Sequence, residues 1–277
     1  RVGKSYILRD FLERHKEDMQ TNFIYINKER KKFDAIKNNE QLNAYIDEHW
    51  VEGLHNFILI DEVQEIESWE KSVRSYRTEE DTDSIITGSK SKMLSSELST
   101  LIGGRYHEIY VQSLSYQEFL LFHELEDNDD ALSKYINYGG LPGLKQVGLD
   151  EEEFVWDYIR AVFHTVMLKD IVERNNIRNV SFLNTLLRYF ADTIGKLSSL
   201  NNISKFMKSQ GLDVSVKSIA AYLNYFRDAY LLLTVDRFDI HGKKLLESNE
   251  KIYFGDVGLR NLIAGGERQG DIEKILE

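Results

Sequence analysis

The stretch Phe57-Ile58-Leu59-Ile60-Asp61-Glu62 decides the fold of this chain. Four apolar residues in a row are typical of a parallel strand that is covered on both faces. Two carboxylates directly after such a strand are costly to remove from water unless a cationic group lies near them. The stretch therefore predicts a buried strand whose carboxyl end carries a functional acidic pair.

The chain opens with a possible partner for this acidic pair, the stretch Arg1-Val2-Gly3-Lys4-Ser5. It matches the second half of the pattern G-x-x-x-x-G-K-[ST], in which backbone N–H groups and a helix N-terminus bind phosphate. The two stretches together predict a site for ATP and Mg²⁺. The expected roles are phosphate binding by Gly3 and Lys4, Mg²⁺ binding by Ser5 and Asp61, and activation of the attacking water by Glu62.

Each stretch also has a simpler interpretation. Half of a phosphate-binding pattern can be an ordinary helix start, and an acidic pair after a strand can be a solvated turn. A second acid favours hydrolysis, because a nucleotide kinase transfers the phosphoryl group to an acceptor other than water. The first glycine of the pattern and the strand before it would precede Arg1, so the expected core lacks its first strand.

The first half of the chain alternates between helical and strand patterns. Strands are expected at 23–26, 57–60, 84–89 and 106–111, and helices at 5–16, 39–50 and 69–77. This alternation predicts a parallel, helix-covered sheet whose ligands bind at the carboxyl ends of the strands. Thr87 or Ser89, at the end of the third strand, could contact the γ-phosphate and the water. Arg105, just before the fourth, could reach the ATP of a neighbouring subunit in a homo-oligomer, or could pair with Glu108 on the surface.

The second half is mainly helical. Helices are expected at 130–138, 151–173, 182–194, 200–210 and 216–228, followed by β-like stretches at 231–238 and 251–254. Three helices with a helix-turn-helix corner and then a β-ribbon predict a winged helix. Seven basic and three acidic residues between Arg178 and Asp228 give this part a net charge of +4, which favours DNA contact. The candidate DNA contacts are Lys217, Ser218, Asn224, Arg227, Lys243 and Lys244. A role in protein packing is the alternative.

Several short motifs, in this order, carry a resemblance to a known family. They are Arg1 to Ser5, Ile60-Asp61-Glu62-Val63-Gln64, Thr87-Gly88-Ser89, Gly104-Arg105-Tyr106, Leu114-Ser115 to Glu118-Phe119, and Ile252-Tyr253-Phe254 to Asp256-Val257-Gly258-Leu259. The chain resembles a group of uncharacterised prokaryotic AAA+ ATPases. The resemblance implies an ATPase core, a winged helix and a restriction-endonuclease-like domain that continues beyond this chain.

The expected fold is therefore α/β. A P-loop AAA+ core occupies 1–113, a helical lid and connector 114–175, a winged helix 176–264, and the start of the nuclease-like domain 265–277. The net charge of −11 argues against a general nucleic-acid coat, and the absence of cysteine agrees with a reducing cytoplasm. No apolar run reaches the ~20 residues that span a bilayer.

The predicted function is Mg²⁺-dependent ATP hydrolysis that drives a conformational switch, with DNA as a candidate partner. Two alternatives stay open. The chain could be a DNA-binding regulator that senses ATP without turning it over, or a scaffold whose nucleotide site is degenerate.

Overall fold

The computed structural model describes residues 2–88, 106–235 and 250–265. The chain forms two compact units, Gly3–Val111 and a second unit that begins at Gln112, and each is described here by itself. The mixed α/β fold class predicted from the sequence is confirmed.

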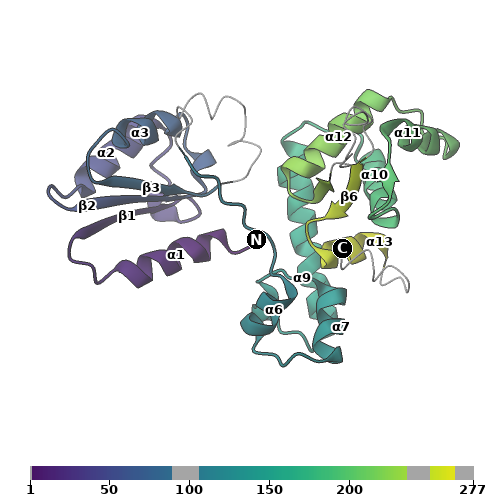
Figure 1. Ribbon diagram of the computed structural model, residues 1–277. Coiled ribbons are helices and arrows are strands. Elements are labelled where there is room, and N and C mark those ends of the chain that lie inside the picture. The colour runs from purple at the N-terminus through teal and green to yellow at the C-terminus, as the bar shows by residue number, and fades with distance from the viewer. Residues whose placement is uncertain (1, 89–105, 236–249, 266–277) are drawn as a thin grey trace, which may run out of the picture. The chain divides into compact units, whose positions relative to one another are not determined.

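The first unit contains a three-stranded parallel sheet in the order β1-β2-β3 (Figure 1). The strands are β1 Thr21–Asn27, β2 His55–Asp61 and β3 Thr82–Ile86. The helices are α1 Lys4–His15, α2 Asn39–His49 and α3 Trp69–Tyr76, with short 3₁₀ turns η1 Lys31–Phe33 and η2 Val63–Glu65. All three strands and all three helices overlap the ranges that the sequence predicted.

The alternation of side chains along each strand divides the sheet into two faces. Ile24 and Ile26 of β1, with Ile58 and Ile60 of β2, pack in one core with side chains of α2 and α3. On the opposite face the ring of Phe11, from α1, lies 5.4 Å from that of Phe57. Asp61 lies four residues after Phe57 and therefore on the α1 face.

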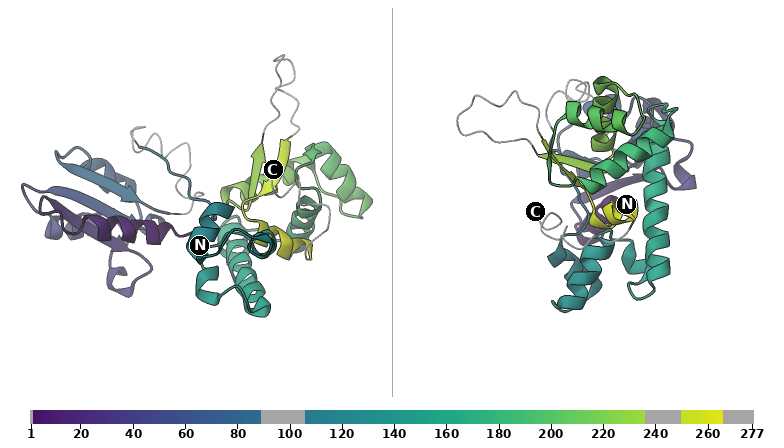
Figure 2. Two further views of the ribbon diagram at one scale, coloured as in Figure 1. Left: turned by 60° about the horizontal axis from the view of Figure 1, so that its bottom comes forward. Right: turned by 90° about the vertical axis from the view of Figure 1, so that its right-hand side faces the viewer.

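The second unit is mainly helical. Its helices are α6 Tyr116–His123, α7 Asp129–Tyr138, α8 Leu144–Val147, α9 Glu152–Thr165, α10 Val180–Asp192, α11 Leu200–Ser209, α12 Val216–Asp228 and α13 Val257–Ala264. An antiparallel sheet in the order β4-β6-β5 is formed by β4 Leu197–Ser198, β5 Leu232–Val235 and β6 Glu250–Phe254. In Figure 2 the green strand β5 and the yellow strand β6 lie side by side. Ser115 and Glu118 form a capping box at the start of α6, and the side chain of Ser215 caps α12.

One hydrophobic core runs through this second unit, from Phe119 on α6 to Leu259 on α13. The segments predicted as a lid and as a winged helix both contribute to it, so neither buries its apolar side chains separately. The predicted boundary between them remains a prediction. Within the described ranges, no helix combines the length and the apolar character that crossing a membrane requires.

Two sequence predictions need correction. The strand expected at 106–111 is wrong, because these residues form no regular structure and the side chains of Ile109 and Tyr110 are 82% and 55% exposed. A β-like pattern is insufficient for a strand when its large apolar side chains stay exposed. The long helix expected at 151–173 changes at Val166 from α9 to a π-helix, η3 Val166–Glu173.

Candidate nucleotide-binding site

Helix α1 begins in a way that suits an anion. Gly3, its N-cap, has a φ of 91°, a conformation that glycine adopts without the strain of a side chain. No side chain caps this end, and the first turn contains no acidic residue. The backbone N–H groups of the first turn of a helix have no partner within it. These groups and the helix dipole favour a phosphate at this position.

Lys4 connects the start of α1 to the end of β3. Its Nζ donates a hydrogen bond of 2.8 Å to the backbone oxygen of Gly88. Gly88 lies two residues after the last residue of β3. The structure therefore brings the predicted phosphate-binding lysine to the carboxyl edge of the sheet.

Asp61, the last residue of β2, is fully buried at the same edge. In the parallel register it lies opposite Asn27, whose Nδ2 donates to Asp61 Oδ2 at 2.9 Å. From the other neighbouring strand, Thr87 Oγ1 donates to Asp61 Oδ1 at 2.5 Å. Both carboxylate oxygens thus have a neutral side-chain donor, one from each side.

Thr87 also fixes the turn that carries Glu62. The backbone N–H of Glu62 donates to Thr87 Oγ1 at 3.3 Å, and that of Val63 donates to the Thr87 backbone oxygen at 3.0 Å. Glu62 has a φ of 59°, which is uncommon for a residue with a side chain and often found at functional sites. Its carboxylate accepts a hydrogen bond from the amide of Gln64.

The residues at this edge fit a Mg²⁺–nucleotide complex. Mg²⁺ prefers carboxylate and hydroxyl oxygens, which Asp61 and Ser5 provide. The present partners of Asp61 are side chains, which can rotate when another ligand approaches. Lys4 and the start of α1 supply positive charge and N–H donors for phosphates.

The structure brings Lys4, Asp61, Glu62 and Thr87 to one region, as their positions in the sequence predicted. Ser5 lies next to Lys4 in the first turn of α1. Ser89, Arg105, Lys243 and Lys244 lie outside the described residues.

The candidate DNA contacts on α12 differ in their surroundings. Lys217 and Asn224 are exposed. Arg227 lies 3.9 Å from Glu250 of β6, and the backbone N–H of Ser218 donates to the N-cap Ser215. Ser218 therefore contributes to the start of the helix.

Asn27 and Gln64 are not among the site residues predicted from the sequence. A signal for Asn27 was available, because it is a polar residue at the end of a strand expected to lie in the same parallel sheet. Gln64 was quoted only as part of a motif. Its contact with Glu62 depends on the turn η2, which the sequence pattern did not predict.

Comparisons with known proteins agree with this geometry. Residues 1–120 match the model of an AAA domain, and residues 129–269 match that of a domain of unknown function, DUF8612. An uncharacterized protein of Haemophilus influenzae is 32% identical over 273 residues, which cover 96% of this chain and 67% of that protein. The uncharacterized protein MJ1544 of Methanocaldococcus jannaschii is 28% identical over 270 residues, 92% of this chain and 58% of that protein.

Among solved structures, the Walker-type ATPase PABY2304 of Pyrococcus abyssi has a similar fold. The TM-score is 0.62 with 16% sequence identity, and the match covers 95% of this chain and 88% of that one. At this identity the likeness concerns the fold. The chain belongs to the family of the H. influenzae protein, and it contains a match to an AAA domain followed by a match to the domain of unknown function DUF8612.

Proposed function

We propose that this chain binds ATP with Mg²⁺ and hydrolyses it, and that the cycle acts as a conformational switch. The observation that carries the proposal is the position of Asp61. A fully buried carboxylate lies at the end of a parallel strand, held by Asn27 and Thr87 from the two neighbouring strands. Burying such a group without a cation is costly. A bound Mg²⁺ would supply positive charge to Asp61 and to the phosphates.

The other residues have separate tasks in this proposal. Gly3 and Lys4 bind phosphate oxygens at the start of α1, and Ser5 and Asp61 hold the metal ion. Glu62 orients the attacking water and accepts its proton. Thr87 keeps the end of β2 in place through Asp61 and the Glu62 N–H. The sequence also predicts that either Thr87 or Ser89 contacts the γ-phosphate, and both residues remain candidates for that contact.

This division of tasks can be tested with two variants of the full-length protein. Lys4→Ala should abolish ATP binding, because it removes the positive charge from the phosphate site. Glu62→Gln should retain binding and lose turnover by a factor of ~10²–10⁴, the usual effect of removing a general base. Nucleotide titration and phosphate release measure the two steps. An equal loss of affinity in both variants contradicts the assignment.

The two alternative functions make different predictions. A regulator that only senses ATP would change its DNA affinity with a non-hydrolysable analogue, which filter binding would detect. A scaffold with a degenerate site would bind no nucleotide. ATPase rates of the full-length protein with and without DNA separate both alternatives from the switch.

A second candidate activity is DNA binding by a winged helix. The succession of α10, β4, α11, α12, β5 and β6 supports this fold, since three helices are followed by a β-hairpin. Helix α12 buries Ile219, Leu223 and Phe226 and exposes Lys217 and Asn224. Such binding would be electrostatic, so affinity for any duplex should fall steeply with salt. Failure to bind at low salt would leave protein packing as the role of this part.

Assembly of subunits is a further part of the hypothesis, with Arg105 acting on the ATP of a neighbouring copy. An arginine in that role contributes ~10³–10⁵ to the rate. Specific activity should therefore rise with protein concentration and fall in Arg105→Ala. Constant activity per subunit on dilution, with normal turnover of the variant, would indicate a monomeric enzyme.

A further inference from the structure

A row of polar side chains crosses the α1 face of the sheet and ends at Asp61. It consists of Arg9 on α1, Tyr25 and Asn27 on β1, and Asp61 on β2. Tyr25 and Asn27 are two residues apart on one strand, so both side chains project to the same face. This is the face that α1 covers, because Phe11 also contacts Phe23 on it, with ring centroids 6.1 Å apart.

Asn27 is oriented without ambiguity. It is 1% exposed, and its Oδ1 accepts a hydrogen bond of 2.8 Å from the backbone N–H of Glu29. A backbone N–H can only donate, so the amide Nδ2 must lie on the other side. There it donates to Asp61 Oδ2 at 2.9 Å and to the Tyr25 hydroxyl at 3.2 Å.

Arg9 continues the row on the helix. It lies one turn after Ser5, on the same side of α1. A hydrogen bond with Tyr25 raises the pKa of the guanidinium, and the negative charge of Asp61 acts in the same direction. Arg9 Nε is buried and has no hydrogen-bond partner among the residues that the structure describes. The guanidinium carbon also lies 5.3 Å from the centroid of the Tyr6 ring on α1, and the hydrogen bond with Tyr25 links this helix to β1.

We propose that Tyr25 and Asn27 are positioning residues that hold the metal-binding carboxylate of Asp61 in register with the phosphate-binding helix α1. The inference rests on the proposed function. Asn27 sets the orientation of Asp61, and Tyr25 connects Asn27 to Arg9. Because α1 starts at Lys4, this row sets the distance between the phosphate-binding and metal-binding parts of the site. Neither residue needs to touch the nucleotide.

The test uses three variants of the full-length protein: Tyr25→Phe, Asn27→Leu and the control Tyr76→Phe. Tyr25→Phe removes only a hydroxyl, and Asn27→Leu replaces the amide with a side chain of similar shape. Tyr76 also has a bonded hydroxyl, to Asp47 at 2.5 Å and the Asn43 backbone at 3.1 Å, but it joins α3 to α2 on the other face. The control therefore reports the general cost of removing a tyrosine hydroxyl from this unit.

The readout is the ratio of the affinities for fluorescently labelled ADP measured in Mg²⁺ and in EDTA. This ratio isolates the contribution of the metal, because general damage to the phosphate site affects both affinities. Asn27→Leu should reduce the ratio by ~10–100-fold, the usual effect of removing a residue that orients a metal ligand. Tyr25→Phe should reduce it several-fold, and Tyr76→Phe should leave it unchanged. The affinity in EDTA should stay the same in all three.

The possible results separate the two proposals. If the unsubstituted protein gains no affinity from Mg²⁺, the proposed function is wrong and the positioning role is wrong with it. If it gains affinity and the Tyr25 and Asn27 variants keep the full gain, only the positioning role is wrong. Thermal unfolding of each variant identifies any that does not fold. If Asn27→Leu does not fold, the result for Tyr25→Phe, which is the smaller change, decides whether the positioning role is correct.

Discussion

The two units each contain a buried aspartate next to the end of a strand, and the two differ in what surrounds them. Asp61, in the first unit, is fully buried and accepts from the side chains of Asn27 and Thr87. Asp256, in the second, is 6% exposed, and each of its carboxylate oxygens accepts from a backbone N–H, that of Gly140 at 2.9 Å and that of Leu259 at 3.1 Å. The backbone of Gly258 and the side chain of Ser113 also form hydrogen bonds with it.

The kind of donor indicates what each carboxylate can do. Side-chain donors rotate about single bonds, so Asp61 can exchange its partners for a metal ion without movement of the chain. Backbone donors are fixed by the chain around them, here the loop after α7 and the first turn of α13, so Asp256 can exchange these two partners only if those segments move. Asp256 therefore joins the loop after α7 to the start of α13, whereas the metal-binding role proposed for Asp61 requires only that two side chains rotate.

The same substitution, aspartate to asparagine, should have opposite consequences at the two positions. At Asp256 the new NH₂ group would face backbone N–H donors, which cannot accept, so one is left unpaired at a cost of ~1–3 kcal/mol. At Asp61 the NH₂ group can donate to Thr87, because a hydroxyl also accepts. Urea unfolding should show a clear loss of stability for Asp256→Asn and a change below ~1 kcal/mol for Asp61→Asn. Only Asp61→Asn should remove the effect of Mg²⁺ on nucleotide affinity.

Two glycines provide a test of the contacts around Asp256, one of them next to this residue and the other as a control. Gly139 and Gly148 both end helices with positive φ, 76° and 85°. A Cβ on Gly139 would lie 2.4 Å from Asp256 Oδ1 and 2.6 Å from the Gly258 nitrogen, whereas one on Gly148 would meet nothing within 4 Å. Gly148→Ala should therefore cost only the backbone strain, ~1–3 kcal/mol. Urea unfolding should show a larger loss of stability for Gly139→Ala than for Gly148→Ala. An equal loss in the two variants would show that the groups around Asp256 move aside at little cost in free energy.

The sequence predicted Asp61 far better than Asp256, for a physical reason. An apolar strand followed by an acid is a local pattern, and parallel pairing brings such strand ends to one edge. The motif that contains Asp256 was recognised, but its contact with Gly140 joins residues 116 positions apart. No local pattern encodes such a contact. Gly139 was correctly predicted as the end of a helix, although its proximity to Asp256 was not.

A similar limit applies within the candidate site. The ends of β1, β2 and β3 were predicted to within a few residues, and with them the edge that carries Asp61, Glu62 and Thr87. The pairing of Asn27 with Asp61 depends on the register of β1 against β2. A shift of one residue would place the side chain of Asn27 on the other face of the sheet. Thr87 was expected to contact phosphate, and in this structure its hydroxyl bonds to Asp61. The phosphate contact remains a prediction.

The stability of the second unit should depend on pH through Asp256. Burial raises the pKa of its carboxyl above the ordinary value of 3.8, and the hydrogen bonds from Gly140 and Leu259 partly oppose the rise. Between 3.8 and the folded pKa, the folded chain binds more protons than the unfolded chain. The free energy of unfolding should therefore fall as pH rises through this interval and be constant above it.

Urea unfolding of the parent and of Asp256→Asn over this pH interval measures the effect. Subtracting the free energy of unfolding of the variant from that of the parent removes the contributions of the other carboxylates. Each unit by which the folded and unfolded pKa values of Asp256 differ corresponds to ~1.4 kcal/mol. The parent should lose stability relative to the variant as pH rises. A difference that does not change with pH would show that Asp256 titrates alike in the folded and unfolded chains.

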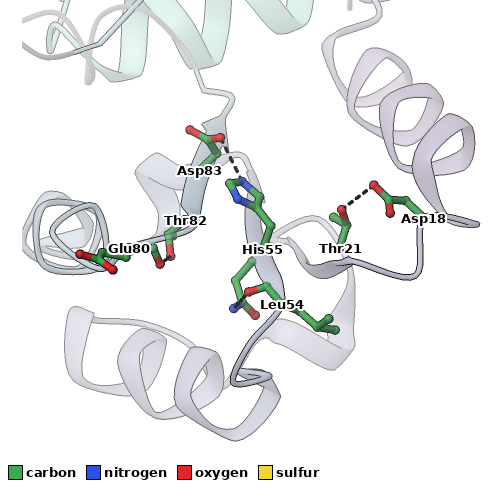
Figure 3. A network of polar contacts seen from close by, with 8 residues as sticks. Asp18, Thr21, Leu54, His55, Glu80, Thr82 and Asp83 are labelled. Atoms are coloured by element: carbon green, nitrogen blue, oxygen red, sulfur yellow. Dashed lines mark hydrogen bonds and ion pairs between the residues drawn. The ribbon is translucent and has the colours of Figure 1, made fainter.

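The smallest effect is expected at the opposite end of the parallel sheet, where β2 and β3 begin. There His55 Nε2 lies 3.1 Å from Asp83 Oδ2, and Thr21 donates to Asp18 at 2.9 Å (Figure 3). The side chains of His55 and Asp83 are 34% and 65% exposed, so water already solvates both groups. Exposed pairs of this kind contribute ~0–1 kcal/mol, and salt screens them further.

Asp83→Asn should therefore change the urea midpoint very little and leave the effect of Mg²⁺ on nucleotide affinity intact. Polar contacts occur at both ends of these strands, and only the end at which the carboxylate is buried should respond to the metal. A loss of Mg²⁺ response in Asp83→Asn equal to that in Asp61→Asn would show that burial does not distinguish the two ends, and the comparison between exchangeable and fixed carboxylates would then lose its physical basis.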